Sequence, residues 1–194
     1  MTTAQRTALI IGDMQTGILA NFPFAERVLP GIAATLPAAR RRGVDIIYLR
    51  AGLRPTPDDI GDGNTLFRKF FDLGDLFHET SPHTDVDPRI APAPTDTVVL
   101  KRRTSGFAHT DLDLVLRTRG ITEFAICGVA TGAMIAATAY AAADLDYGVT
   151  VLRDLCADDN DDIHTFLCDH LFPSRGMTVT TAAAWLDNPT AQQH

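Results

Sequence analysis

The sequence predicts a three-layer α/β/α domain, in which helices cover both faces of a mainly parallel, six-stranded, Rossmann-like sheet. Short runs of branched apolar residues recur along the chain, as is typical of strands that are buried on both faces. Helical patterns separate these runs, and strands that alternate with helices favour parallel pairing. The chain of 194 residues suffices for one well-buried core. We therefore expect a single domain over residues 1–194.

The six expected strands are rich in Ile, Val and Leu. They show little alternation between apolar and polar residues, which indicates burial on both sides. They comprise residues 8–13, 44–49, 97–101, 123–127, 148–152 and 177–180.

Helices are expected between the strands, over about residues 24–42, 110–119, 132–145 and 158–172. Pro30 and Pro37 leave the course of the first helix open, because proline lacks the N–H that a helix interior uses. The second helix is closed by Gly120, a residue that suits a helix C-terminus. The long segment 51–96 is rich in turn-forming residues and has little periodicity, so we expect it to form a binding loop or lid.

Composition argues against some classes of partner. The formal net charge is -7 and the isoelectric point is about 5.2, so we expect neither nucleic acid nor an anionic membrane surface as a partner. No apolar run approaches the ~20 residues of a membrane-spanning helix. The three cysteines, Cys127, Cys156 and Cys168, lack the spacing of a metal site. An odd number of cysteines without a secretory segment favours reduced thiols in a cytoplasmic protein.

Three chemically useful features lie at the carboxyl ends of predicted strands. Asp13 ends the first strand, Lys101 ends the third, and the turn 128–134 follows the fourth. Ligands of open α/β sheets bind at the carboxyl ends of the strands, near the switch in strand order. An acid, a cation and a set of backbone N–H groups at a helix N-terminus would together form a plausible reaction centre.

The motifs around these features resemble those of the isochorismatase-like hydrolases, a family within the cysteine hydrolase superfamily. Ile11-Gly12-Asp13-Met14-Gln15 resembles the Asp-x-Gln that ends a strand in that family. The segment from Lys101 to Thr110 resembles its Lys-x-x-x-Ser-Ala-Phe-x-x-Thr motif. The segment from Ile126 to Ala139 resembles the turn that carries its nucleophile. The similarity extends over nearly the whole chain, in the right order and spacing.

The resemblance implies a triad of Asp13, Lys101 and a cysteine, but Met134 occupies the position of the cysteine. A thioether has no acidic proton, so this residue cannot attack as a thiolate. The family pattern also implies a cis peptide bond between Val129 and Ala130. Backbone N–H groups of the turn would bind an oxyanion; its residues are Val129, Ala130, Thr131, Gly132 and Ala133.

Further expectations concern the pocket and the partners. The candidate pocket residues are Gln15, Phe22, Arg54 and Phe107, and Phe107 is equally expected in the core. The metal-binding Asp/His/His cluster of the nicotinamidase branch has no counterpart after Leu49, so we expect no metal and no cofactor. The resemblance implies a small-molecule substrate or ligand and a homo-oligomer of two or more subunits.

The sequence leaves three functions open. The first is a hydrolase that acts without a cysteine, by acid-base chemistry of Asp13 and Lys101 on a small carboxylate-bearing or vinyl-ether metabolite. Isochorismatases, which carry glycine in place of the cysteine, are the precedent for such a mechanism. The second is an inactive binding or scaffold protein that retains the pocket. The third is an amidase with an unexpected nucleophile, for which Cys156 is the candidate.

Overall fold

The computed structural model describes residues 6–187, and its centre is a six-stranded sheet in which all neighbouring strands are parallel. The strand order is β3-β2-β1-β4-β5-β6. The strands are β1 (Arg6–Gly12), β2 (Asp45–Ala51), β3 (Thr97–Lys101), β4 (Ile121–Val129), β5 (Gly148–Ala157) and β6 (Thr178–Thr180). The structure therefore confirms the α/β class and places a strand at each predicted position.

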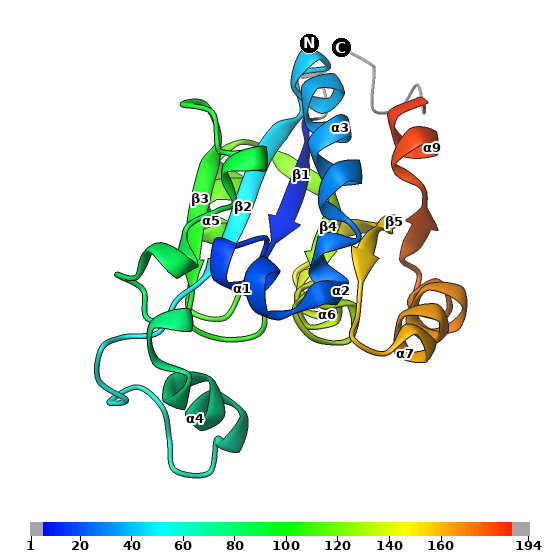
Figure 1. The fold of residues 1–194 in the computed structure, drawn as a ribbon. Coiled ribbons are helices and arrows are strands. Elements are labelled where there is room, and N and C mark those ends of the chain that lie inside the picture. The colour runs from blue at the N-terminus through cyan, green and yellow to red at the C-terminus, as the bar shows by residue number, and fades with distance from the viewer. Residues whose placement is uncertain (1–5, 188–194) are drawn as a thin grey trace.

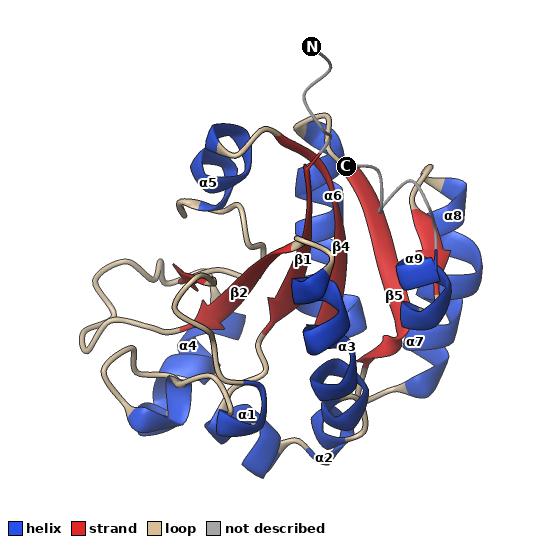
Figure 2. Ribbon diagram, turned by 90° about the horizontal axis from the view of Figure 1, so that it is seen from above, coloured by secondary structure: helices blue, strands red, loops and turns tan. Residues whose placement is uncertain are grey.

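Helices cover both faces of this sheet. Figures 1 and 2 show α3 (Leu29–Arg41) on one face, and α5 (Leu112–Thr118) and α6 (Ala136–Asp144) on the opposite face. The helix α9 (Ala182–Asp187) packs beside α3. The fold thus has the three expected layers.

The predicted helix over 24–42 consists of two pieces, α2 (Pro23–Glu26) and α3. Pro30 lies in the first turn of α3, where its missing N–H costs nothing, and α3 continues through Pro37. The predicted helix over 158–172 is also divided, into α7 (Asp161–Phe166), the π-helical turn η5 (Leu167–Leu171) and α8 (Phe172–Ser174).

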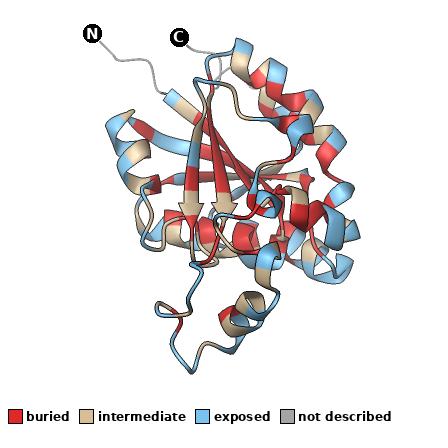
Figure 3. Cartoon of the chain, turned by 60° about the vertical axis from the view of Figure 1, so that its left-hand side comes forward, coloured by how far each residue is buried: buried red, intermediate tan, exposed pale blue. Residues whose placement is uncertain are grey.

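The segment between β2 and β3 was expected to form a loop or lid, but it contains four short helices. They are α4 (Thr65–Asp72), η1 (Gly74–Leu76), η2 (Pro82–Thr84) and η3 (Pro88–Ile90). Another unanticipated helix, α1 (Thr16–Asn21), directly follows β1. The part that carries α4 extends beyond the carboxyl ends of the strands and is mostly exposed (Figure 3). It is joined to the end of β2 by backbone hydrogen bonds from Leu53 N to Phe77 O (2.7 Å) and from Glu79 N to Leu53 O (2.8 Å).

The core lies between the sheet and its helices. In β1, Ala8, Leu9, Ile10 and Ile11 are almost fully inaccessible to solvent. Burial of consecutive residues means that both faces of the strand are covered, which agrees with the continuous apolar runs. Within residues 6–187, no helix has the length and apolar character required to cross a membrane.

Candidate active site

The candidate site lies where the strand order changes direction, between β1 and β4. Gly12 of β1 pairs with Gly128 of β4 at the carboxyl ends of the two strands. Gly128 has a φ of 113°, and a Cβ atom there would overlap the carbonyl oxygen of Gly12. Glycine is required for both reasons, because it tolerates positive φ and permits close backbone approach. The two chain segments that leave these strands therefore begin side by side.

Asp13 begins the first of these segments. Its φ of 59° lies in the left-handed region, which Asp tolerates better than most residues. Its backbone N–H donates to Leu49 O at 3.0 Å, which fixes the turn against β2. This conformation places the carboxyl group at the base of a cavity that Lys101 also lines.

Asp13 and Lys101 form a buried ion pair. The Lys101 Nζ atom lies 2.9 Å from Asp13 Oδ2, and the two side chains are 4% and 14% exposed. Lys101 Nζ also donates to the carbonyl oxygen of Arg103 at 3.3 Å. Oδ1 of Asp13 is buried and has no hydrogen-bond partner among the described residues. Burial raises the pKa of Asp13, and the nearby charge and hydrogen bond of Lys101 only partly oppose that rise.

The turn after β4 forms a second wall. The peptide bond between Val129 and Ala130 is cis, as the family resemblance implies. The π-helical turn η4 (Thr131–Ile135) follows and leads into α6. Val129, Ala130 and Ala133 line the cavity.

Two other residues of the turn contact α7 and the loop before it. Gly132 N donates to Asp158 Oδ2 at 2.7 Å, and Thr131 Oγ1 lies 2.8 Å from His164 Nδ1. Gly132 N–H is therefore engaged by a carboxylate. These contacts hold the turn in place, and one of them occupies the Gly132 N–H that was expected to bind an oxyanion.

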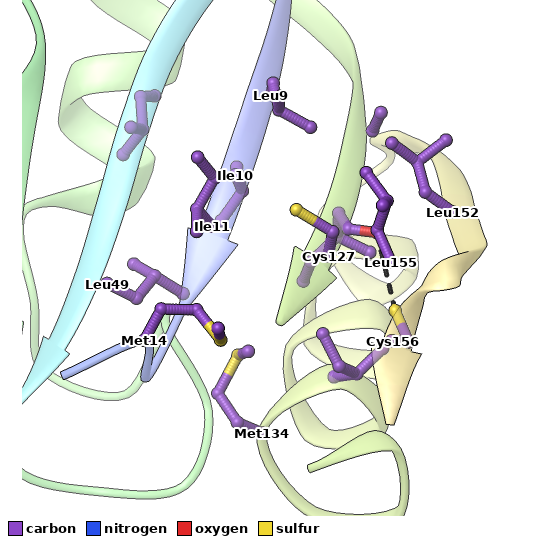
Figure 4. Packing of buried hydrophobic residues seen from close by; sticks show 14 of the residues in the cluster. Leu9, Ile10, Ile11, Met14, Leu49, Cys127, Met134, Leu152, Leu155 and Cys156 are labelled. Carbon is purple, nitrogen blue, oxygen red and sulfur yellow. Dashed lines mark hydrogen bonds between the residues drawn. The ribbon is translucent and has the colours of Figure 1, made fainter. Parts of the chain in front are cut away.

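Met134 lies inside the cavity wall and is 1% exposed. Figure 4 shows the side chains of Met14 and Met134 directed toward each other near the end of β1. Thr138 Oγ1 lies 3.5 Å from the Met134 sulfur and accepts a hydrogen bond from Gly106 N at 2.9 Å. The thioether is thus packed between the end of β1 and α6, in the wall of the cavity that Asp13 also lines.

The cavity has a volume of about 220 Å³ and mostly apolar walls. Five phenylalanines line it: Phe22, Phe24, Phe67, Phe70 and Phe77. Its charged or hydroxyl-bearing lining residues are Asp13, Lys101, Arg103 and Thr104. Polar groups are concentrated near the strand ends, and the segment that carries α4 supplies much of the apolar wall.

The other predicted pocket residues have different positions. Gln15 is 1% exposed, and its side chain bonds to the backbone of Ala51 and Thr84. Arg54 is absent from the lining of this cavity and instead borders a neighbouring hollow with Asp59. Phe107 also lies outside the lining and stacks on Tyr147, with ring centres 5.7 Å apart. Phe22 does line the cavity.

Arg103 and the phenylalanines of the segment that carries α4 were not predicted from the sequence to line the cavity. Leu66, Phe67 and Phe70 follow helical spacing, and this pattern could have identified an apolar helix within the long segment. Arg103 had no such signal, because its place in the cavity depends on a contact with Asp59, far away in sequence. Among residues 6–187, no group of three or more His, Cys, Asp or Glu side chains is arranged to hold a metal ion.

Comparison with known proteins shows the family. Residues 7–184 match the isochorismatase domain. A ureidoacrylate amidohydrolase of Azorhizobium caulinodans is 31% identical over 171 residues, covering 77% of this chain and 75% of that protein. An Arabidopsis thaliana protein named "probable inactive nicotinamidase" is 30% identical over 171 residues, covering 83% of this chain and 85% of that one. The crystal structure of an isochorismatase family protein from Desulfovibrio vulgaris has a TM-score of 0.84 at 27% identity, covering 94% of this chain and 97% of that one. The chain therefore belongs to the isochorismatase-like hydrolase family.

Proposed function

We propose that this protein is a hydrolase that acts without a cysteine nucleophile and cleaves a small carboxylate-bearing vinyl ether, with Asp13 as the general acid. The observation that carries the proposal is the state of the Asp13 carboxyl group. It is buried at the cavity base, and one of its oxygens has no hydrogen-bond partner among residues 6–187. Burial raises its pKa despite the Lys101 ammonium group. A carboxyl group with a raised pKa remains protonated to higher pH, as a general acid requires.

The reaction needs no covalent intermediate. Asp13 donates its proton to the terminal carbon of the vinyl ether, and the adjacent carbon becomes an oxocarbenium ion. Water attacks that carbon and returns a proton to the Asp13 carboxylate. The resulting hemiketal then transfers its hydroxyl proton to the leaving alcohol and collapses to a 2-keto acid. Asp13 is regenerated, and one water molecule is consumed for each bond cleaved.

Lys101 has a supporting role in this scheme. Its ammonium group contacts Asp13 and the carbonyl oxygen of Arg103. After proton transfer, the same ammonium group stabilises the Asp13 carboxylate that has formed in a poorly solvated place. We therefore assign Lys101 to stabilising the conjugate base and to limiting the rise in the pKa of Asp13.

Met134 occupies the position at which the family pattern places the nucleophilic cysteine, and none of the three cysteines is an accessible replacement. Cys127, Cys156 and Cys168 are all buried. Burial raises the pKa of each thiol, to about 11 for Cys168 and further for the other two. A thiol with a raised pKa in an apolar environment is a poor nucleophile. These features disfavour an amidase that works through one of the remaining cysteines.

The test is release of a 2-keto acid from vinyl ethers of decreasing size. Isochorismate, 2-benzyloxyacrylate and 2-methoxyacrylate all yield pyruvate, which a coupled lactate dehydrogenase assay detects. We expect turnover by the wild-type protein, and a loss of about 10²–10⁴-fold in Asp13→Asn. Arg54→Gln, at an arginine that does not line the cavity, is the matched control and retains activity. Circular dichroism would establish that Asp13→Asn is folded.

The alternative function is binding without turnover. It is favoured by the packing of Met134 against Gly12 in the cavity wall, which fills space that a substrate could use, and by the relative whose name describes it as inactive. Absence of pyruvate from all three compounds would overturn the acid mechanism and leave this alternative.

A further inference from the structure

The size and walls of the cavity restrict what it can bind. An engineered apolar cavity of about 150 Å³ accommodates benzene, so the volume of about 220 Å³ here admits one ring with a short substituent. The aromatic wall comes from three places in the chain: Phe22 and Phe24 after β1, Phe67 and Phe70 of α4, and Phe77. Aromatic walls of this kind favour flat, apolar ligands. A strongly hydrated or many-armed ligand would lose its water without equivalent contacts.

The charges that line the cavity do not balance. Asp13 and Lys101 form an ion pair with each other. The remaining charged lining residue is Arg103, and no carboxylate in the described part of the chain lies within ion-pair distance of it. The cavity therefore carries an excess positive charge in a protein whose formal net charge is -7. This local excess favours an anionic ligand.

Arg103 is also held in a fixed position. Its Nη1 donates to the Arg102 carbonyl oxygen at 2.6 Å, and its Nη2 donates to the carbonyl oxygen of Asp59. The guanidinium carbon lies 5.3 Å from the ring centre of Phe67, which itself lines the cavity. A guanidinium group has five N–H donors, so these two contacts leave others for a ligand. A planar group fixed in this way is well suited to binding a carboxylate.

Lys101 is less suited to that role. Its ammonium group is nearly inaccessible and already contacts Asp13 Oδ2 and the Arg103 carbonyl oxygen. A ligand carboxylate at Lys101 would compete with the Asp13 carboxylate, whereas one at Arg103 would displace no acid from its partner. The two cations therefore have different functions: Lys101 acts on Asp13, and Arg103 is available to the ligand.

We infer that the cavity binds a small apolar molecule, about the size of one ring, that carries a single carboxylate, and that Arg103 is the residue that recognises the carboxylate. The inference rests on the proposed function, because it concerns the same cavity, but it makes a separate claim about binding. Within the proposed reaction it restricts the substrate to a monoanion with a flat apolar body. It also makes Arg103 a determinant of specificity.

The experiment compares the binding of benzoate and benzamide, which have the same shape but differ in charge, by isothermal titration calorimetry and ligand-observed NMR. The proteins are wild type, Arg103→Gln, Arg54→Gln and Asp13→Asn. We expect wild type to prefer benzoate, and Arg103→Gln to lose roughly 10- to 100-fold of benzoate affinity, the range for a hydrogen bond to a charged group. Benzamide affinity should change little. Arg54→Gln should retain the preference, because Arg54 does not line this cavity.

Three results would overturn the inference: no benzoate binding to wild type, equal affinity for the two ligands, or an unchanged preference in Arg103→Gln. Asp13→Asn separates the inference from the proposed function. It should bind benzoate at least as tightly as wild type, because asparagine cannot carry a negative charge in the cavity and leaves the Lys101 ammonium group without an acidic partner. If benzoate binds through Arg103 while every vinyl ether is left intact, the proposed reaction fails and the recognition by Arg103 stands. If vinyl ethers are cleaved equally well by Arg103→Gln, the reaction stands and the recognition fails.

Discussion

The terminal methyl group of Met134 lies in the space that a Cβ atom at Gly12 would need. Gly12 lies at the carboxyl end of β1, and Met134 lies in the connection between β4 and β5. A side chain at residue 12 would therefore compete with Met134 for the same space. The absence of a side chain at residue 12 is what permits the long thioether to pack there. This relationship couples the end of β1, directly before Asp13, to the turn that follows β4.

Gly12→Ala is expected to destabilise the protein. The added methyl group would overlap Met134 in a packed core, at a cost of roughly 1–3 kcal/mol. The measurement is urea unfolding of wild type, Gly12→Ala, Met134→Ala and the double variant. Because the clash requires both side chains, the double variant should lose less stability than the sum of the two single losses. Additive losses would show that the two side chains do not compete for the same space.

Lys101→Met is expected to raise the pKa of Asp13 further. Burial raises that pKa in the native protein, and the charge and hydrogen bond of Lys101 lower it. Removing the ammonium group leaves the upward effect unopposed, so the protonated form persists to higher pH. Titration of ¹³C-labelled aspartate carboxyl groups by NMR measures the change without a substrate. Arg54→Gln should leave the Asp13 titration in place, and an unchanged or lower pKa in Lys101→Met would contradict the assigned role of Lys101.

The native protein is expected to resist thiol alkylation. Its three cysteines are buried and their pKa values are raised by burial, so few thiolates are present at neutral pH. Iodoacetamide should leave ligand binding intact, and mass spectrometry should find the thiols modified only after unfolding. Met134→Cys provides a positive control, because it places a thiol in the cavity wall. Rapid modification of a native cysteine, accompanied by loss of function, would revive the amidase hypothesis.

Gln15→Leu is expected to destabilise the protein by about 3 kcal/mol, since it leaves buried backbone groups without partners. The Gln15 side chain donates to Ala51 O at 2.8 Å and to Thr84 O at 2.9 Å, and accepts from Ala51 N at 2.7 Å. Hydrogen exchange at Ala51 should accelerate, together with a lower urea midpoint. Asn21→Ala removes a single bond from an exposed side chain and should cost no more than about 0.5 kcal/mol. Equal losses in the two variants would contradict the bridging role of Gln15.

Local patterns in the sequence were sufficient to locate the sheet and to place Asp13 and Lys101 at the same edge of it. The predicted strand 97–101 has the observed bounds; Lys101 is its last residue, as predicted, and Asp13 directly follows β1. The fifth strand is longer than predicted. A register shift between Ile126 and Gly128 lets β5 pair with β4 as far as Ala157, and the sequence of β5 alone does not encode such an irregularity.

The sequence was less informative where position depends on distant contacts. From the sequence, Phe107 was compatible with either the core or the cavity. Its stacking on Tyr147 depends on how the connection between β3 and β4 packs against the connection between β4 and β5. Arg103 belongs to the short basic run 101–103 in the sequence, and its position involves contacts with Asp59 and Phe67, which are distant in sequence. Long-range packing of this kind has no periodic signature, so sequence patterns could not identify these two positions.

The segment between β2 and β3 supplies Phe67, Phe70 and Phe77 to the cavity, whereas Asp13, Lys101 and Met134 lie at or just after the ends of the strands. The acid and the ammonium group of the proposed reaction therefore lie at the sheet, whereas much of the apolar wall of the cavity belongs to the segment between β2 and β3. Substitutions in the segment that carries α4 are expected to change ligand preference and to leave the ion pair between Asp13 and Lys101 intact. Exchanging this segment between members of the family is therefore expected to transfer ligand selectivity from one member to another.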